Sequence, residues 1–217
     1  MRNILLILLF LGQSVFCQEY HFDRFVQYKE TSFAYQGYTF TTVYFNSKNP
    51  SYYLVNRSWN SQINAYIVDN ITNTTHNFFI EDLSKNKEYA YLNSKKFNPA
   101  DCEIDCSKNS IEEANNAGQF TKITYNEFTN AKKKRKDYEI EVIVKPSEFT
   151  CLKPLIRILQ HHFLFCEELT TTDNSLPVSA KLTRGKEIRS EQKLEATGNI
   201  DLDFSVKKES IKYTTTN

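Results

Sequence analysis

The residues best suited to chemistry in this chain are a histidine pair and a nearby cysteine. His161 and His162 are adjacent, and an imidazole can act as a general base or bind a metal ion. Cys166 follows His162 by four residues, so a helix would place both on one face, where they could share a zinc ion. The paired cysteine spacing of a zinc ribbon is missing, and such histidines more often pack in a core. We therefore predict no catalytic residue, metal site or cofactor, and keep His162 with Cys166 as the alternative.

The first seventeen residues have the layout of a secretory signal peptide. A basic residue precedes an unbroken apolar run at 4–11, and polar sequence follows. We predict cleavage after Cys17, which makes 1–17 the signal peptide and 18–217 the exported chain. The competing interpretation makes Cys17 a lipidated first residue, which the bulky Phe16 disfavours.

Export would place the other cysteines in an oxidising compartment. Cys102, Cys106, Cys151 and Cys166 are even in number, so we expect two disulfides. Three connectivities are open, of which a local scheme pairs Cys102 with Cys106 and Cys151 with Cys166. A straight helix over 151–166 would hold its ends about 22 Å apart, beyond the about 7 Å that a disulfide tolerates. Either this segment bends or the bridges join the two clusters.

Composition favours a packed, strand-rich protein. The chain has 13 Tyr and 16 Phe but only 5 Gly and 5 Pro, which is typical of strands with aromatic faces and not of a disordered chain. The 27 basic and 26 acidic residues nearly balance, which gives no reason to expect a nucleic-acid partner. The basic run 132–136 is predicted to be a solvated loop between two strands. After the leader, no segment reaches the about 20 apolar residues of a transmembrane helix.

Apolar and polar residues alternate in many short segments, which predicts an antiparallel sheet. The predicted strands lie at 37–46, 52–55, 63–67, 76–80, 88–92, 123–125, 138–144, 178–182 and 200–206. After Pro146 the apolar spacing changes to three and four residues, which predicts a helix within 152–166. Residues 94–119 are expected to form a loop or a short helical excursion, because Ser110 begins a capping-box pattern. The fold class is therefore mainly β (α+β): a single domain with a curved, antiparallel, multi-stranded sheet and one or two packed helices.

Aromatic side chains on the predicted strands could line an apolar groove. The candidate ligand-binding residues are Tyr38, Phe40, Tyr52, Tyr66, Phe78 and Tyr91. Aromatic residues in these positions also fill the core of any β protein, which is their commoner role. The sequence leaves open whether this face is filled or hollow.

The predicted mature chain begins with Gln18-Glu19 and Tyr20-His21-Phe22-Asp23, and Lys- and Asn-rich strands follow. In this it resembles uncharacterised exported proteins of the Bacteroidota. The order of elements, antiparallel strands followed by a helix and further strands, is similar to that of LolA-like carriers, whose curved sheet holds acyl chains against helices. That likeness implies binding of a lipid or a lipoprotein.

Together these features predict an exported, non-enzymatic binding or envelope-associated protein that is periplasmic, at the cell surface or extracellular. We expect it to hold an apolar or lipid ligand on an aromatic sheet face, with a lipid or cell-envelope component as its partner. The alternative is a secreted hydrolase-like or metal-dependent enzyme that uses His161 and His162. The identity of the ligand and the oligomeric state do not follow from the sequence.

Overall fold

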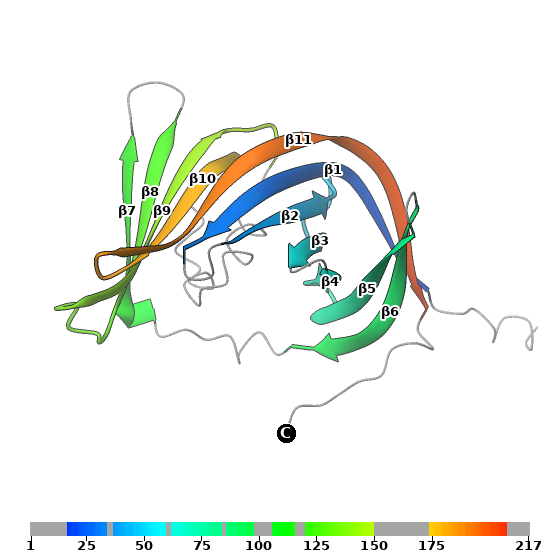
Figure 1. The fold of residues 1–217 in the computed structure, drawn as a ribbon, viewed down its shortest axis with the longest axis horizontal. Helices are drawn as coiled ribbons and strands as arrows, with labels where there is room; N and C mark the ends of the chain where they lie inside the picture. The colour runs from blue at the N-terminus through cyan, green and yellow to red at the C-terminus, as the bar shows by residue number, and fades with distance from the viewer. Residues whose placement is uncertain are drawn as a thin grey trace, which may run out of the picture.

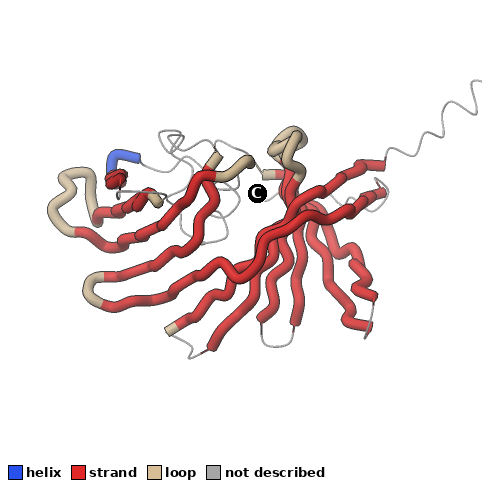
Figure 2. The backbone as a smooth tube through the Cα atoms, turned by 90° about the horizontal axis from the view of Figure 1, so that it is seen from above, coloured by secondary structure: helices blue, strands red, loops and turns tan. Residues whose placement is uncertain are grey.

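The computed structural model describes residues 17–33, 37–59, 62–83, 86–97, 106–115, 120–149 and 174–207. In chain order the strands are β1 (Cys17–Ser32), β2 (Gly37–Phe45), β3 (Tyr52–Trp59), β4 (Gln62–Asp69), β5 (Thr74–Leu83), β6 (Asn86–Lys96), β7 (Asn109–Asn115), β8 (Thr121–Phe128), β9 (Lys136–Pro146), β10 (Ser175–Arg184) and β11 (Glu187–Lys207). Within these ranges all strands belong to one antiparallel sheet, and the helical structure is a single 3₁₀ turn, η2 (Cys106–Lys108). Figure 2 shows this turn in blue among the red strands.

The sheet consists of two meanders that meet at its centre. Its order is β6-β5-β4-β3-β2-β1-β11-β10-β9-β8-β7, so neighbours in the chain are neighbours in space except where β1 pairs with β11. These two strands run together over the top of an arch (Figure 1). Their register shifts between Phe22 and Arg24 and again between Gln27 and Tyr28. Such bulges bend and twist a strand pair, which accounts for the curvature at this point.

A glycine helps β1 and β11 to bend together. Gly198 lies directly opposite Phe25, and a Cβ atom on Gly198 would stand only 2.9 Å from the Phe25 ring. The missing side chain therefore leaves room for the ring to lie against the β11 backbone.

Both faces of the sheet carry buried apolar side chains, because adjacent residues of a strand point to opposite faces. We call one the valine face; its cluster on the first meander is Val26, Tyr28, Val43, Phe45, Tyr53, Val55 and Val68. We call the other the aromatic face; its cluster is Tyr20, Phe22, Leu54, Ala65, Ile67, Phe78, Ile80 and Val206. Neighbouring Leu54 and Val55 of β3 are both fully buried on opposite faces. The centre of the first meander is thus covered on both sides.

The valine face continues across the second meander. Leu194 of β11 packs against the first cluster, and Gln192, two residues earlier, lies on the same face. Gln192 pairs with Ala180 of β10, which in turn pairs with Val142 of β9. Ala180 and Val142 belong to a second cluster, completed by Ile123, Tyr125, Ile140, Val144 and Leu182.

The structure confirms the antiparallel, curved and mainly β prediction. Each predicted strand lies within an observed strand or overlaps it. The basic run 132–136 is exposed and lies between β8 and β9 except for Lys136, the first residue of β9. The predicted helical excursion at Ser110 is wrong, because this residue lies in β7, whose ladder pairs with β8. Ile111 packs there against the apolar cluster of β8 to β10. Cross-strand hydrogen bonds and this contact override the local capping pattern.

Several predictions fall on residues outside the described ranges. They are the helix within 152–166, the cysteines Cys102, Cys151 and Cys166, and the leader except for Cys17, the first residue of β1. Of Cys106 only the backbone is described. The expectation of one or two packed helices therefore finds no support in the described residues, whose only helix is the turn η2. In the same ranges no helix has the length and apolar character that crossing a membrane requires.

Replacing Leu54 by alanine should lower the free energy of unfolding by about 2–4 kcal/mol, because a fully buried side chain on the aromatic face leaves a cavity. Leu92→Ala is the matched control, since Leu92 is 56% exposed, and should change it by less than about 0.5 kcal/mol. Urea denaturation followed by circular dichroism measures both. Equal effects of the two substitutions would contradict the assignment of Leu54 to the core.

Candidate functional site

The structure separates the six candidate aromatic residues. Five lie on the aromatic face: Tyr38, Phe40, Tyr52, Phe78 and Tyr91. Tyr66 lies on the valine face and packs against its first cluster. Tyr38 and Phe40 are 64% and 37% exposed and contact each other edge to face, with ring centroids 5.6 Å apart. Tyr52 packs edge to face on Tyr20 and Phe22.

Phe78 and Tyr91 line an open recess on the aromatic face. Its volume is about 400 Å³, and its lining is Phe78, Tyr89, Tyr91, Asp203, Phe204, Ser205 and Val206. These residues come from β5, β6 and β11. In the order of the sheet, β6 is an edge strand and β11 lies six positions away from it. The centroid of the Phe204 ring lies 4.9 Å from that of Phe78 and 5.0 Å from that of Tyr89, and both contacts are edge to face. The curvature of the sheet thus brings the β5–β6 hairpin against the end of β11, and the recess lies between them.

The phenol groups near the recess are held in their neutral form. Burial raises the pKa of Tyr89, although a hydrogen bond that Asn56 Nδ2 donates to its hydroxyl at 2.7 Å opposes this shift. Burial also raises the pKa of neighbouring Tyr44 to about 12. Tyr89 and Tyr44 therefore carry no charge at neutral pH. Asp203 also contributes to the lining, but its carboxylate pairs with His21 on the face opposite Phe204.

A buried chain of hydrogen bonds lies behind the recess and joins β1, β4, β5 and β6. Because the Asp69 carboxylate can only accept, the Tyr20 hydroxyl donates to Asp69 Oδ2 at 3.1 Å. His76 Nε2 can then donate to the Tyr20 oxygen at 3.0 Å, and Ser94 Oγ to His76 Nδ1 at 2.5 Å. The Tyr91 hydroxyl completes the chain at 2.8 Å from Ser94 Oγ. This network fixes Tyr91, a wall of the recess, to the interior.

The same network contains a serine, a histidine and an aspartate, the group types of a hydrolase relay. Here the Tyr20 hydroxyl stands between His76 and Asp69, and both Ser94 and His76 have no exposed surface. A substrate could not reach this serine without opening the sheet. The arrangement therefore stabilises the fold, since every member is hydrogen-bonded.

Burial also determines the protonation states in this network. It lowers the pKa of His76, with the charge of Asp69 acting in the opposite direction. It raises the pKa of Tyr20, and the charge and hydrogen bond of Asp69 raise it further. Both side chains are consequently neutral at pH 7. The sequence offered no signal for this cluster, because its residues are far apart in the chain and His76 stood out only as part of a strand.

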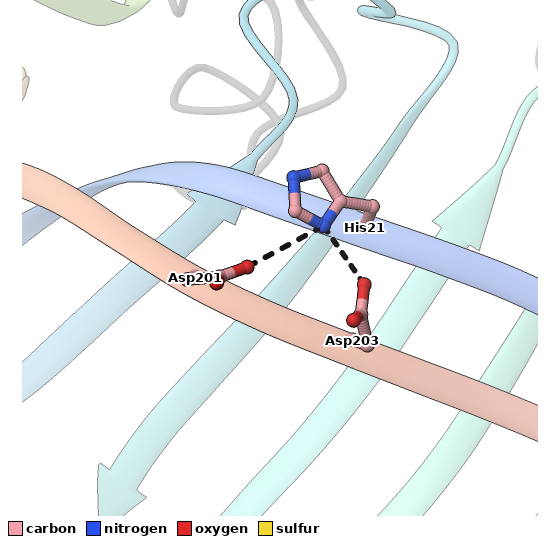
Figure 3. Close-up of side chains that lie close together, drawn as sticks. All are labelled: His21, Asp201 and Asp203. Atoms are coloured by element: carbon pink, nitrogen blue, oxygen red, sulfur yellow. Dashed lines mark hydrogen bonds and ion pairs between the residues drawn. The ribbon is translucent and has the colours of Figure 1, made fainter.

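A second cluster, on the surface, has metal-binding group types. His21 of β1 lies opposite Asp203 of β11, and Asp201 lies two residues away (Figure 3). His21 Nδ1 is 2.8 Å from Asp203 Oδ1 and 3.9 Å from Asp201 Oδ1, and the three ligand atoms lie within 4.8 Å of one another. The aspartate side chains are 84% and 91% exposed. Such hydrated carboxylates need no ion, and a cross-strand ion pair accounts for the arrangement.

A smaller recess of about 290 Å³ lies over β8 to β11 and is lined largely by charged side chains. Lys122 and Lys181 both contact the Glu141 carboxylate. Their hydrogen bonds, that of Lys122 first, lower the pKa of Glu141. The charges at the centre of this recess are already paired, so an apolar ligand finds no complementary surface there.

The histidine pair and Cys166 predicted as the enzymatic alternative lie outside the described residues. Comparison of the chain with models of known protein families gave no match, and neither did comparison with curated proteins. The aromatic recess is therefore the candidate site on structural grounds alone.

Lowering the pH from 7.5 to 5 should destabilise the protein through His76. Below the ordinary pKa of about 6.5 the unfolded chain binds a proton at this residue. The folded chain, in which the pKa is lowered, binds it only at lower pH, so acid favours unfolding. His76→Gln should remove this component of the pH dependence, measured by urea denaturation at several pH values above 5. A slope identical to that of the wild type would contradict the buried neutral state of His76.

Proposed function

We propose that this chain is an exported, non-enzymatic binding protein that holds an apolar or lipid ligand in the recess of the aromatic face. The observation that supports the proposal is that four aromatic side chains, Phe78, Tyr89, Tyr91 and Phe204, line an open recess of about 400 Å³. Small-molecule sites have volumes of about 300–1,000 Å³ and combine apolar walls with a few polar groups. The phenol groups of Tyr89 and Tyr91 are such polar groups in this lining.

The physical basis of binding is the removal of apolar ligand surface from water. Each Å² of apolar surface that a ligand buries against these rings contributes about 25 cal/mol. The neutral phenols of Tyr89 and Tyr44 add no charge that such a ligand would have to desolvate. The Tyr91 wall is anchored through Ser94, so little side-chain freedom is lost on binding.

Export, disulfides and helices belong to the same proposal. The leader 1–17 supports a periplasmic, cell-surface or extracellular location, and the four remaining cysteines support two disulfides in that compartment. The apolar spacing within 152–166 supports a packed helix. The enzymatic alternative through His161 and His162 has no support among the described residues, because both lie outside them.

Binding of N-phenyl-1-naphthylamine, an uncharged fluorescent apolar probe, tests the recess. Phe204→Ala should weaken probe binding about tenfold, because the side chain that closes the recess against Phe78 and Tyr89 is lost. Phe40→Ala is the matched control on the same face outside the recess, and should leave the affinity unchanged. Fluorescence titration gives both affinities.

Two further measurements keep this test decisive. Phe204→Leu retains apolar packing and should bind the probe with intermediate affinity if the alanine variant folds poorly. Native mass spectrometry of the gently purified protein should detect a bound lipid. Wild-type affinity in a folded Phe204→Ala variant, or a wild-type protein that binds neither probe nor lipid, would refute the proposal.

A further inference from the structure

The valine face contains a polar group of side chains between its two apolar clusters. Glu30 of β1 lies opposite Gln192 of β11 and opposite Thr39 of β2, while Arg57 of β3 lies opposite Thr41 of β2. Every second residue of a strand points to the same face. Glu30, Thr41 and Arg57 therefore lie on the valine face, as Val26, Val43 and Val55 do. Four neighbouring strands, β11, β1, β2 and β3, thus contribute to one polar site.

An ion pair crosses β2 above the two threonines. Arg57 Nη2 lies 2.8 Å from Glu30 Oε2, and the two side chains are only 18% and 14% exposed. Gln192 Nε2 donates to the same carboxylate oxygen at 3.3 Å. The pair uses one guanidinium nitrogen and one carboxylate oxygen, and is not the bidentate arrangement that arginine and carboxylate usually prefer.

Three buried polar atoms around this pair have no hydrogen-bond partner. They are Thr39 Oγ1, Thr41 Oγ1 and Arg57 Nε. Thr41 is fully buried and Thr39 is 6% exposed. Buried polar groups are nearly always hydrogen-bonded, so three unpartnered atoms in one place can still form hydrogen bonds with a further group. An N–H group and two hydroxyls can all donate, which calls for an acceptor.

We propose that Thr39, Thr41 and Arg57 bind the oxygen of an acyl ligand, as a carboxylate or as an ester carbonyl. The donors favour an oxygen acceptor, and Glu30 compensates the charge of Arg57, so that a neutral ester fits as well as a carboxylate. The apolar cluster that adjoins these donors along β2 and β3, with Val43 and Val55, favours a ligand whose oxygen is attached to an apolar chain. The partly exposed ion pair leaves an approach to the site. This site lies on the opposite face from the aromatic recess and does not depend on it.

Valine replaces threonine with almost the same shape, which gives a direct test. The Thr39→Val/Thr41→Val variant should fold with unchanged or higher stability, because the hydroxyls that it removes are unpartnered in the structure. It should bind 11-(dansylamino)undecanoic acid about tenfold more weakly, because two hydrogen bonds to the ligand oxygen are lost. Thr31→Val, in the neighbouring strand β1 and on the opposite face, is the matched control and should keep wild-type affinity.

The methyl ester of the same probe distinguishes the two oxygen types. Weaker binding of both acid and ester supports recognition of a carbonyl oxygen, and weaker binding of the acid alone supports a carboxylate site. N-phenyl-1-naphthylamine should bind the double variant as it binds the wild type, which separates this site from the recess. Unchanged affinity for both dansyl probes in a folded double variant would show that the site holds water only, and would overturn the proposal.

Discussion

The pairing of β1 with β11 is the constraint on which the rest of the sheet depends. It extends from Cys17 opposite Lys207 to Ser32 opposite Ser190 and joins the two meanders, each of which is otherwise a run of local hairpins. Because this contact joins the two ends of the described chain, it costs more chain entropy than any hairpin. Its side chains offset that cost: Phe22 and Val26 are fully buried, on opposite faces.

The bend of this central pair explains where the candidate site lies. The bulge after Phe22 turns the ends of β1 and β11 over the aromatic face, so that Phe204 reaches the rings of Phe78 and Tyr89. A flat sheet of the same order would hold β6 and β11 far apart. The recess is therefore a product of curvature, and the Tyr20–His76 hydrogen bond, which ties β1 to β5, helps to maintain that curvature.

Both faces of the sheet contain buried polar groups. On the aromatic face, the network from Tyr91 to Asp69 satisfies each of its members, and such a network rigidifies a core. On the valine face, the ion pair between Glu30 and Arg57 leaves neighbouring donors unpartnered. Buried groups with partners stabilise the core, whereas buried groups without one, which include Asn56 Oδ1 on the aromatic face, leave room for hydrogen bonds to water or a ligand.

The sequence by itself determined nine of the eleven strands, all but β1 and β7, since an alternation such as that of Ile140, Val142 and Val144 is a local consequence of one buried face. It also suggested Phe78 and Tyr91 as ligand residues, but could not separate them from Tyr66, because the face of each strand depends on register and bulges. Ser110, expected in a loop or a short helical excursion, lies in a strand because β7 pairs with β8. Only the tertiary structure decided which residues meet across β1 and β11, because hydrogen bonds between distant strands leave no periodic trace in the chain.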